Sequence, residues 1–175
     1  IIRDSEAKLL ITSPLFEQVL EDIRAECPDL PILIADGDDE DEFGSALSAQ
    51  SAEPIADQHA GLTMLYSSGT TGRPKGIRPA PPEVPDPTAV VPFLALATMG
   101  AGMPSDGSMV YLSPAPLYHA APIGWCSAGH RLGGTVVMME KFDPELALQT
   151  IEKYGVTGSQ WVPTPFVRFL RLPEE

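Results

Sequence analysis

Short apolar runs and one amphipathic segment fill the first 35 residues. Residues 8–12 and 31–35 are apolar runs that are typical of strands. Between them, apolar side chains recur at helical spacing over 15–23, directly after Ser13 and Pro14, which suit the N-cap and first position of a helix. A Cys-Pro pair then ends the helix. The pattern therefore predicts a β-α-β unit with parallel strands and a right-handed crossover.

The second half of the chain repeats this alternation. Apolar runs predict strands over 109–113 and 135–139. A further short strand that ends at Trp161 is predicted within 156–162. Helical patterns are found over 124–132, 144–154 and 163–170. Strands that alternate with helices predict an α/β fold, with a layered, mostly parallel sheet and helices on both faces. A ligand is then expected at the carboxyl ends of the strands.

Two further segments disfavour regular structure. Residues 36–42 form an acidic run that lacks the alternation of a calcium-binding EF-hand loop. We interpret it as the start of a solvated, flexible connector that continues to about residue 60. Residues 78–87 contain five prolines and cannot form a helix interior. The apolar stretch 88–99 that follows predicts a packed helix.

The stretch 62–76 changes from apolar to polar. Its first four residues, 62–65, are mostly apolar and predict a buried strand. The glycines that follow let the backbone approach a ligand closely, and successive backbone N–H groups in such a loop form a concave anion site. The candidate phosphate-binding residues are Ser67, Ser68, Gly69, Thr70, Thr71, Gly72, Arg73, Lys75 and Gly76. Because they combine hydroxyl donors with a lysine charge, they suit the binding of a polyphosphate.

This loop differs from the common nucleotide-binding motifs. In a Walker A motif starting at Gly69, the second glycine would fall on Pro74, and Lys75 would precede Ser or Thr rather than Gly76. No Gly-x-Gly-x-x-Gly fingerprint occurs. Gly69 to Gly72 fits the short GXXG clamp of KH domains, but a chain this acidic disfavours nucleic acid as a partner.

Charge along the 175-residue chain is distributed unevenly. The net charge is −13, which argues against nucleic acid and anionic membranes as partners. No lysine or arginine lies between Arg24 and Arg73 or between Arg78 and Arg131, so that Arg73, Lys75 and Arg78 form an isolated group of positive charges. This group fits an anion-binding loop, although a solvated loop with chance clustering remains the alternative.

Cysteine content and hydropathy indicate the cellular compartment in which the protein is expected. Two cysteines, Cys27 and Cys126, do not make a disulfide framework. The sequence has neither a signal peptide nor an apolar run long enough to span a bilayer. We therefore expect a cytoplasmic protein in a reducing environment. The pattern does not indicate an oligomeric state.

The segment from Tyr66 to Gly76, Tyr-Ser-Ser-Gly-Thr-Thr-Gly-Arg-Pro-Lys-Gly, resembles the phosphate-loop signature of the AMP-forming adenylate synthetases. The resemblance implies ATP as a substrate and an acyl-adenylate made from a carboxylic acid. It assigns the catalytic roles in this segment to Lys75, Thr70 and Thr71. The alternative is an ordinary surface loop rich in Gly, Ser, Thr and Pro.

A second segment, Pro116 to His119, resembles the Pro-Leu-(Phe/Tyr)-His segment of the acyl-CoA synthetase branch of that family. The resemblance implies that Tyr118 and His119 border the acyl pocket. His119 is not expected to be a general base, because a carboxylic acid substrate is already ionised at pH 7. Trp125 is a further pocket candidate, for which core packing is the alternative.

The resemblance predicts an acyl-CoA synthetase that adenylates a fatty or other hydrophobic acid, releases pyrophosphate and forms the coenzyme A thioester. Its cofactors would be ATP, Mg²⁺ and coenzyme A. The family's Tyr-Gly-x-Thr-Glu segment, Thr-Gly-Asp segment and lid lysine do not occur, and no metal-binding residue is assigned here. Residues 1–60, a β-α-β unit plus acidic linker, and 61–175, the loop-bearing part, would then belong to one truncated AMP-binding domain.

Because the chain begins with Ile1 rather than Met and resembles only part of this family, we expect it to be an internal or trimmed segment of a longer protein. Because the family segments named above are missing, we expect this segment to be inactive alone. An anion-binding or interaction module that has kept the loop without catalysis is the alternative function. The gene of the full-length protein distinguishes the two functions. Only the ligase requires that the family's missing segments are encoded downstream of residue 175.

Overall fold

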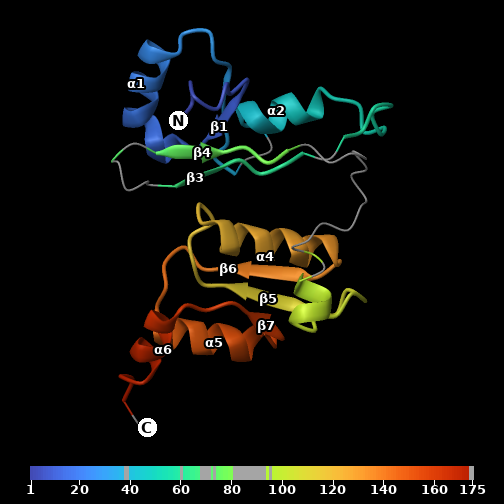
Figure 1. Cartoon of the computed structure of the whole chain (residues 1–175), viewed down its shortest axis with the longest axis vertical. Coiled ribbons are helices and arrows are strands. Elements are labelled where there is room, and N and C mark those ends of the chain that lie inside the picture. The colour runs from blue at the N-terminus through green and yellow to red at the C-terminus, as the bar shows by residue number, and fades with distance from the viewer. Residues whose placement is uncertain are drawn as a thin grey trace. The chain divides into compact units, whose positions relative to one another are not determined.

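The computed structural model describes residues 1–37, 40–59, 61–67, 72, 74–80, 94 and 96–173. The chain forms two compact units, residues 1–88 and residues 89–175, which are described separately (Figure 1). The division into 1–60 and 61–175 stays a prediction.

The N-terminal unit begins with the expected β-α-β arrangement. Strands β1 (Leu10–Thr12) and β2 (Ile32–Ile34) pair in parallel, and the 3₁₀ turn η1 (Pro14–Phe16) and helix α1 (Glu17–Glu26) connect them. The side chain of Ser13 accepts a hydrogen bond from the backbone N–H of the turn, as the sequence predicts for this N-cap. The parallel pairing confirms this part of the predicted fold.

The prediction of a flexible connector after β2 is wrong at its start, because helix α2 (Glu42–Ser48) forms there. The Asp41 carboxylate caps this helix, accepting hydrogen bonds from the backbone N–H of Gly44 at 2.6 Å and of Asp36 at 2.8 Å. The Glu42 carboxylate accepts a further bond from the Ile34 N–H in β2 at 3.0 Å. The acidic side chains therefore bond to backbone donors and anchor the helix.

Strands β3 (Leu65–Ser67) and β4 (Lys75–Ile77) form an antiparallel hairpin in the same unit. The prediction of a buried strand at the start of this stretch is wrong, because Leu62 is 45% exposed and Leu65 is 37% exposed. A two-stranded ribbon leaves much of both faces to solvent, which accounts for the difference.

The C-terminal unit contains a three-stranded parallel sheet in the order β6-β5-β7. Its elements are η2 (a π-helix, Leu96–Gly100), β5 (Val110–Ser113), α4 (Ala120–Arg131), β6 (Thr135–Met138), α5 (Pro144–Tyr154), β7 (Gly158–Ser159) and α6 (Pro163–Phe169). Figure 1 shows α4 and α5 on opposite sides of this sheet. The parallel sheet between helices confirms the predicted α/β class.

Several boundaries in this unit differ from the predicted ones. Helix α4 starts four residues before the predicted 124–132, since a proline is tolerated in the first turn, where backbone N–H groups have no partner inside the helix. Strand β7 is only two residues long. Most of the helix predicted over 88–99 lies outside the described residues, and its described end belongs to the π-helix.

The core of the C-terminal unit forms where α4 packs on β5. Met109, Tyr111 and Cys126 are buried together in one cluster. Gly134 permits this packing, because a Cβ atom there would lie 2.9 Å from the backbone oxygen of Met109 and 3.1 Å from its side chain. Burial raises the pKa of Tyr111, since the ionised phenolate would lose its hydration.

Helix α5 begins and ends as its sequence predicts. The Asp143 carboxylate accepts a hydrogen bond from the backbone N–H of Leu146 at 2.9 Å. Gly155 terminates the helix with a φ of +59°, in the left-handed region that favours glycine.

Candidate functional site

The β3–β4 hairpin brings the two ends of the candidate phosphate loop together. In its register, Ser67 pairs with Lys75 and Tyr66 pairs with Gly76. The loop residues Ser68, Gly69, Thr70, Thr71 and Arg73 lie outside the described residues. The hairpin nevertheless fixes where this loop leaves and re-enters the sheet, with a hydroxyl at one end and an ammonium group opposite.

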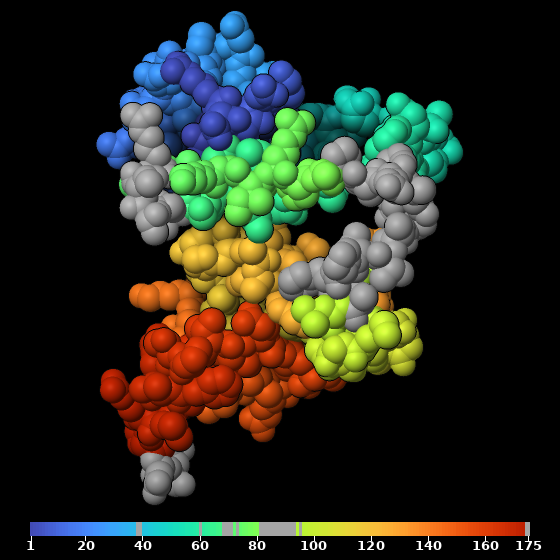
Figure 2. Space-filling model, in the orientation of Figure 1, coloured from blue at the N-terminus to red at the C-terminus, as the bar shows by residue number. Residues whose placement is uncertain are grey.

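Lys75 is exposed at the start of β4, and Figure 2 shows the residues of this strand on the surface of the N-terminal unit. No carboxylate of the described residues forms an ion pair with it. An exposed ammonium group without such a counter-ion can bind an anionic ligand at a smaller cost than one that must first leave a carboxylate.

Two glycines of the loop region meet different requirements. Gly72 has a φ of +80°, a conformation that residues with a side chain rarely adopt. Gly76 lies against its neighbours: a Cβ atom there would be 2.4 Å from Cε of Met64 and 3.0 Å from Cζ of Tyr66. The first glycine is therefore required by the backbone turn, and the second by close packing.

Trp125, the third candidate for the acyl pocket, lines a cavity in the C-terminal unit. The cavity has a volume of about 340 Å³ and is lined by Ala101, Met103, Trp125, Ser159, Gln160, Trp161 and Phe166. The Trp125 ring also stacks on the Tyr111 ring, with 6.5 Å between ring centroids. Trp125 therefore packs on the core and also faces a mostly apolar cavity.

Tyr118 and His119 do not line this cavity. They lie between β5 and α4, where His119 is the N-cap residue, and their ring centroids are 4.5 Å apart. The Tyr118 side chain is 81% exposed. A substrate pocket shared by Tyr118, His119 and Trp125 stays a prediction.

The other cavity residues were not predicted from the sequence. Gln160 and Trp161 belong to the segment 156–162, for which a short strand was predicted, and Phe166 belongs to a predicted helix. In the sequence Val-Thr-Gly-Ser-Gln-Trp-Val of this segment, no residue pattern signalled a cavity. These residues meet only because the chain returns after β7 to the side of Trp125.

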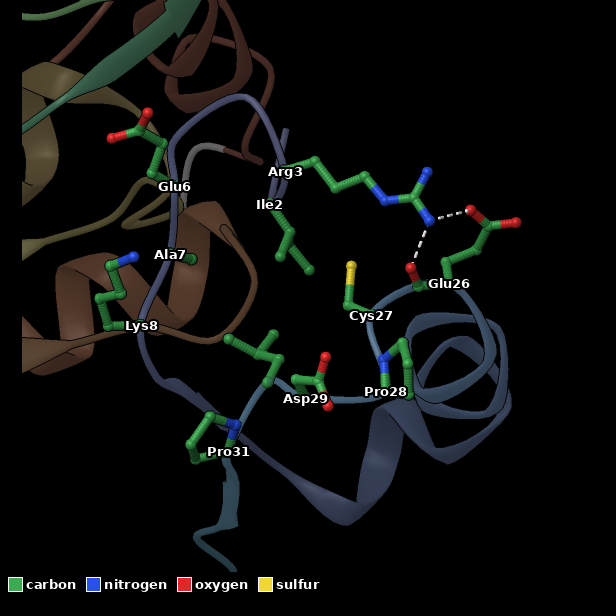
Figure 3. Close-up of a pocket in the computed structure, with 11 residues that line it drawn as sticks. Ile2, Arg3, Glu6, Ala7, Lys8, Glu26, Cys27, Pro28, Asp29 and Pro31 are labelled. Atoms are coloured by element: carbon green, nitrogen blue, oxygen red, sulfur yellow. Dashed lines mark hydrogen bonds and ion pairs between the residues drawn. The ribbon is translucent and has the colours of Figure 1, made fainter.

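A larger cavity of about 550 Å³ lies in the N-terminal unit, between the first residues of the chain and the turn after α1 (Figure 3). The Arg3 guanidinium reaches across its edge to the Glu26 carboxylate at 2.8 Å and to the Glu26 backbone oxygen. Its lining includes both cations and carboxylates but none of the candidate site residues. We assign no chemistry to it.

Within the part of the chain that the structure describes, no group of three or more His, Cys, Asp or Glu side chains could hold a metal ion. None of the helices described there is both long and apolar enough to cross a membrane.

Comparison with known proteins identifies the family. The family model for "AMP-binding enzyme" matches residues 1–175, the whole chain. Acyl-CoA synthetase 7 of Caenorhabditis elegans is 34% identical over 123 residues, which are 69% of this chain and 23% of that protein. The 4-chlorobenzoate–CoA ligase of Pseudomonas sp. (strain CBS-3) is 34% identical over 154 residues, 83% of this chain and 27% of that ligase. The chain therefore spans about a quarter of the length of these relatives.

Solved structures share the fold. The inhibitor-bound N-terminal domain of FACL13 from Mycobacterium tuberculosis matches with a TM-score of 0.70 and 24% identity, over 98% of this chain and 42% of that one. O-succinylbenzoate coenzyme A synthetase from Bacillus subtilis, in complex with ATP and magnesium, matches with a TM-score of 0.65 and 22% identity, over 99% of this chain and 34% of that one. From the match over its entire length, the chain belongs to the family of AMP-binding enzymes.

Proposed function

We propose that this chain is the phosphate-binding segment of a cytoplasmic, ATP-dependent acyl-CoA synthetase. The enzyme adenylates a hydrophobic carboxylic acid, releases pyrophosphate and transfers the acyl group to coenzyme A. One observation carries the proposal: the hairpin sets Ser67 opposite Lys75 at the two ends of a loop of glycines and hydroxyls. Residues 1–60 and 61–175 are then two parts of one AMP-binding domain.

In the first half-reaction, a carboxylate oxygen attacks the α-phosphorus of ATP, and the bond to the β-phosphate oxygen breaks as pyrophosphate leaves. Negative charge grows on the departing β- and γ-phosphates. The Lys75 ammonium group is the positive charge that this chain supplies there, and Thr70 and Thr71 supply hydroxyl donors. Charge-assisted hydrogen bonds of this kind contribute about 1.5–3 kcal/mol each. Catalysis then consists mainly of positioning and electrostatic stabilisation.

Magnesium enters with the nucleotide in this proposal. The described residues offer no carboxylate cluster for the ion, and the Bacillus subtilis neighbour is a complex with both ATP and magnesium. An ion held by the phosphates would offset part of their charge. The segment itself contributes the lysine and the hydroxyls rather than metal ligands.

The cavity beside Trp125 supports a hydrophobic acid as substrate. Its walls are formed largely by Trp125, Trp161, Phe166 and Met103, and burial of apolar ligand surface against such walls favours binding. We propose that the hydrophobic part of the acid binds there and, from the family resemblance, that Tyr118 and His119 border the acyl pocket. Among the relatives are an acyl-CoA synthetase and a chlorobenzoate ligase, so both fatty and aromatic acids should be assayed.

A module that binds anions without catalysis is the second candidate. The exposed Lys75, which forms no ion pair with a carboxylate of the described residues, would serve such binding without a catalytic step. The two functions differ in the full-length protein, where only the ligase would exchange pyrophosphate into ATP when the acid is added.

The test changes Lys75 to Ala in the full-length ligase and measures acid-dependent ATP–pyrophosphate exchange at limiting ATP. We expect a loss of about tenfold or more, because one charge-assisted contact to the phosphates is removed. Lys153→Ala is the matched control, since Lys153 lies on α5 over the Tyr154 ring. Undiminished exchange in Lys75→Ala would refute the proposal. The 175-residue chain alone is expected to show no exchange.

A further inference from the structure

The hairpin that carries the phosphate loop is short and largely exposed. Each strand has three residues, and all of β4 is exposed. Two-stranded ribbons of this length are marginally stable by themselves. Contacts outside the hairpin must therefore hold its register if Ser67 and Lys75 are to stay opposite each other.

Tyr66 makes such contacts through its ring. It is the central residue of β3, and its partner across the hairpin is Gly76. The ring lies so close to this glycine that a Cβ atom there would be 3.0 Å from Cζ and 3.1 Å from Cε1 of Tyr66. The side chain thus covers the backbone of β4 one residue after Lys75.

The hydroxyl of Tyr66 ties the hairpin to the beginning of the chain. It donates a hydrogen bond to the Asp4 carboxylate at 2.6 Å, across 62 residues of sequence. This bond to Asp4 raises the pKa of Tyr66, because the carboxylate favours the protonated phenol.

The segment that holds Asp4 is itself anchored. Within it, the backbone N–H of Ser5 donates to the Ile1 oxygen at 2.8 Å. The neighbouring Arg3 forms an ion pair with Glu26 at the end of α1. Contacts therefore run from the loop hairpin through Tyr66 and Asp4 to the β-α-β unit.

We infer that Tyr66 is a positioning residue for nucleotide binding: between Gly76 and Asp4, it holds the hairpin in the register that presents Ser67 and Lys75 together to the phosphates. Tyr66 does not touch the nucleotide and acts through the strand that carries Lys75. The inference rests on the proposed function of the loop.

The test measures the KM for ATP and the KM for the acid in the full-length ligase. Tyr66→Phe keeps the ring and removes the hydroxyl, whereas Asp4→Ala removes the nearer acceptor, at 2.6 Å, and leaves the Ile1 backbone oxygen at 3.5 Å. Each change is expected to raise the KM for ATP about threefold to tenfold, the loss that one hydrogen bond typically gives, and to leave the KM for the acid unchanged. The double variant should resemble either single one, because both remove the same bond.

Three further variants sharpen the test. Asp4→Asn retains a carbonyl acceptor and should restore part of the ATP affinity that Asp4→Ala loses. Tyr154→Phe and Asp22→Asn are matched controls at exposed positions on α5 and α1, and neither should change the KM for ATP.

Two results would overturn the inference while leaving the proposed function intact. In the first, Lys75→Ala loses ATP affinity but Tyr66→Phe keeps it. In the second, Tyr66→Phe raises both KM values and lowers the melting temperature, which would mark a merely structural role. If Lys75→Ala retains full ATP affinity, the proposed function and this inference fail together.

Discussion

At the scale of single residues, the site depends on where a side chain is absent as much as on where one is present. Because Gly76 has no side chain, the Tyr66 ring and the Met64 side chain approach the β4 backbone closely, and a Cβ atom there would lie 3.0 Å from Cζ of Tyr66 and 2.4 Å from Cε of Met64. Lys75, one residue earlier, contributes the charge. Neighbouring positions therefore serve packing and ligand binding separately.

This arrangement predicts the effect of Gly76→Ala. The added methyl group would displace Met64 and press on the Tyr66 ring, which should raise the KM for ATP and lower the free energy of unfolding by about 1 kcal/mol. ATP titration and urea unfolding measure the two effects. Gly61→Ala is the control, because nothing lies within 4 Å of its Cβ position and its φ is not positive. If Gly76→Ala and Gly61→Ala have the same KM for ATP and the same free energy of unfolding, the prediction is contradicted.

At the scale of elements, the caps of the helices explain what the sequence predicts well. The Asp-Pro start and the glycine stop of α5 are local signals, and the structure confirms both. The β1–α1–β2 unit is equally local. Helix α2 could not be predicted in this way, because its anchoring depends on the N–H groups of Asp36 and Ile34, which come near the acidic run only after β2 has formed.

The α2 cap also predicts a dependence of stability on pH. The hydrogen bond from the Gly44 N–H, followed by those from Asp36 and Gly37, lowers the pKa of the Asp41 carboxyl below its usual value of 3.8. A carboxyl whose pKa is lower in the folded state stabilises the fold above its unfolded pKa and ceases to do so as the pH falls through the folded value.

Asp41→Asn isolates this charge effect, since asparagine is also a good N-cap. The variant should be less stable than the parent chain at pH 7, and the difference should shrink as the pH falls below 3.8. Urea unfolding between pH 7 and pH 3 measures it. Asp29→Asn is the control, because Asp29 is exposed and lies outside the α2 cap. If the difference in unfolding free energy between the two proteins stays constant with pH, the charge of Asp41 does not stabilise the cap.

At the scale of the whole molecule, the sequence predicts the fold class and the family more readily than the cavities. The parallel pairing of β5 with β6 and β7 follows from the alternation of strands and helices. The exposure of β3 does not follow from its own apolar residues, because burial depends on what else covers a strand. The cavity beside Trp125 likewise combines residues far apart in the chain, which no local pattern brings together.

The same cavity has a practical consequence, because the chain has only two tryptophans and both Trp125 and Trp161 line it. Their ultraviolet emission is therefore a built-in optical reporter of that one place, and no dye has to be attached. Adding an acid that enters the cavity to the isolated 175-residue chain should shift or quench the emission, with a saturating titration curve. Trp161→Phe should reduce the amplitude and leave one emitter. If no acid that the enzyme activates changes the emission spectrum, the substrate binds elsewhere.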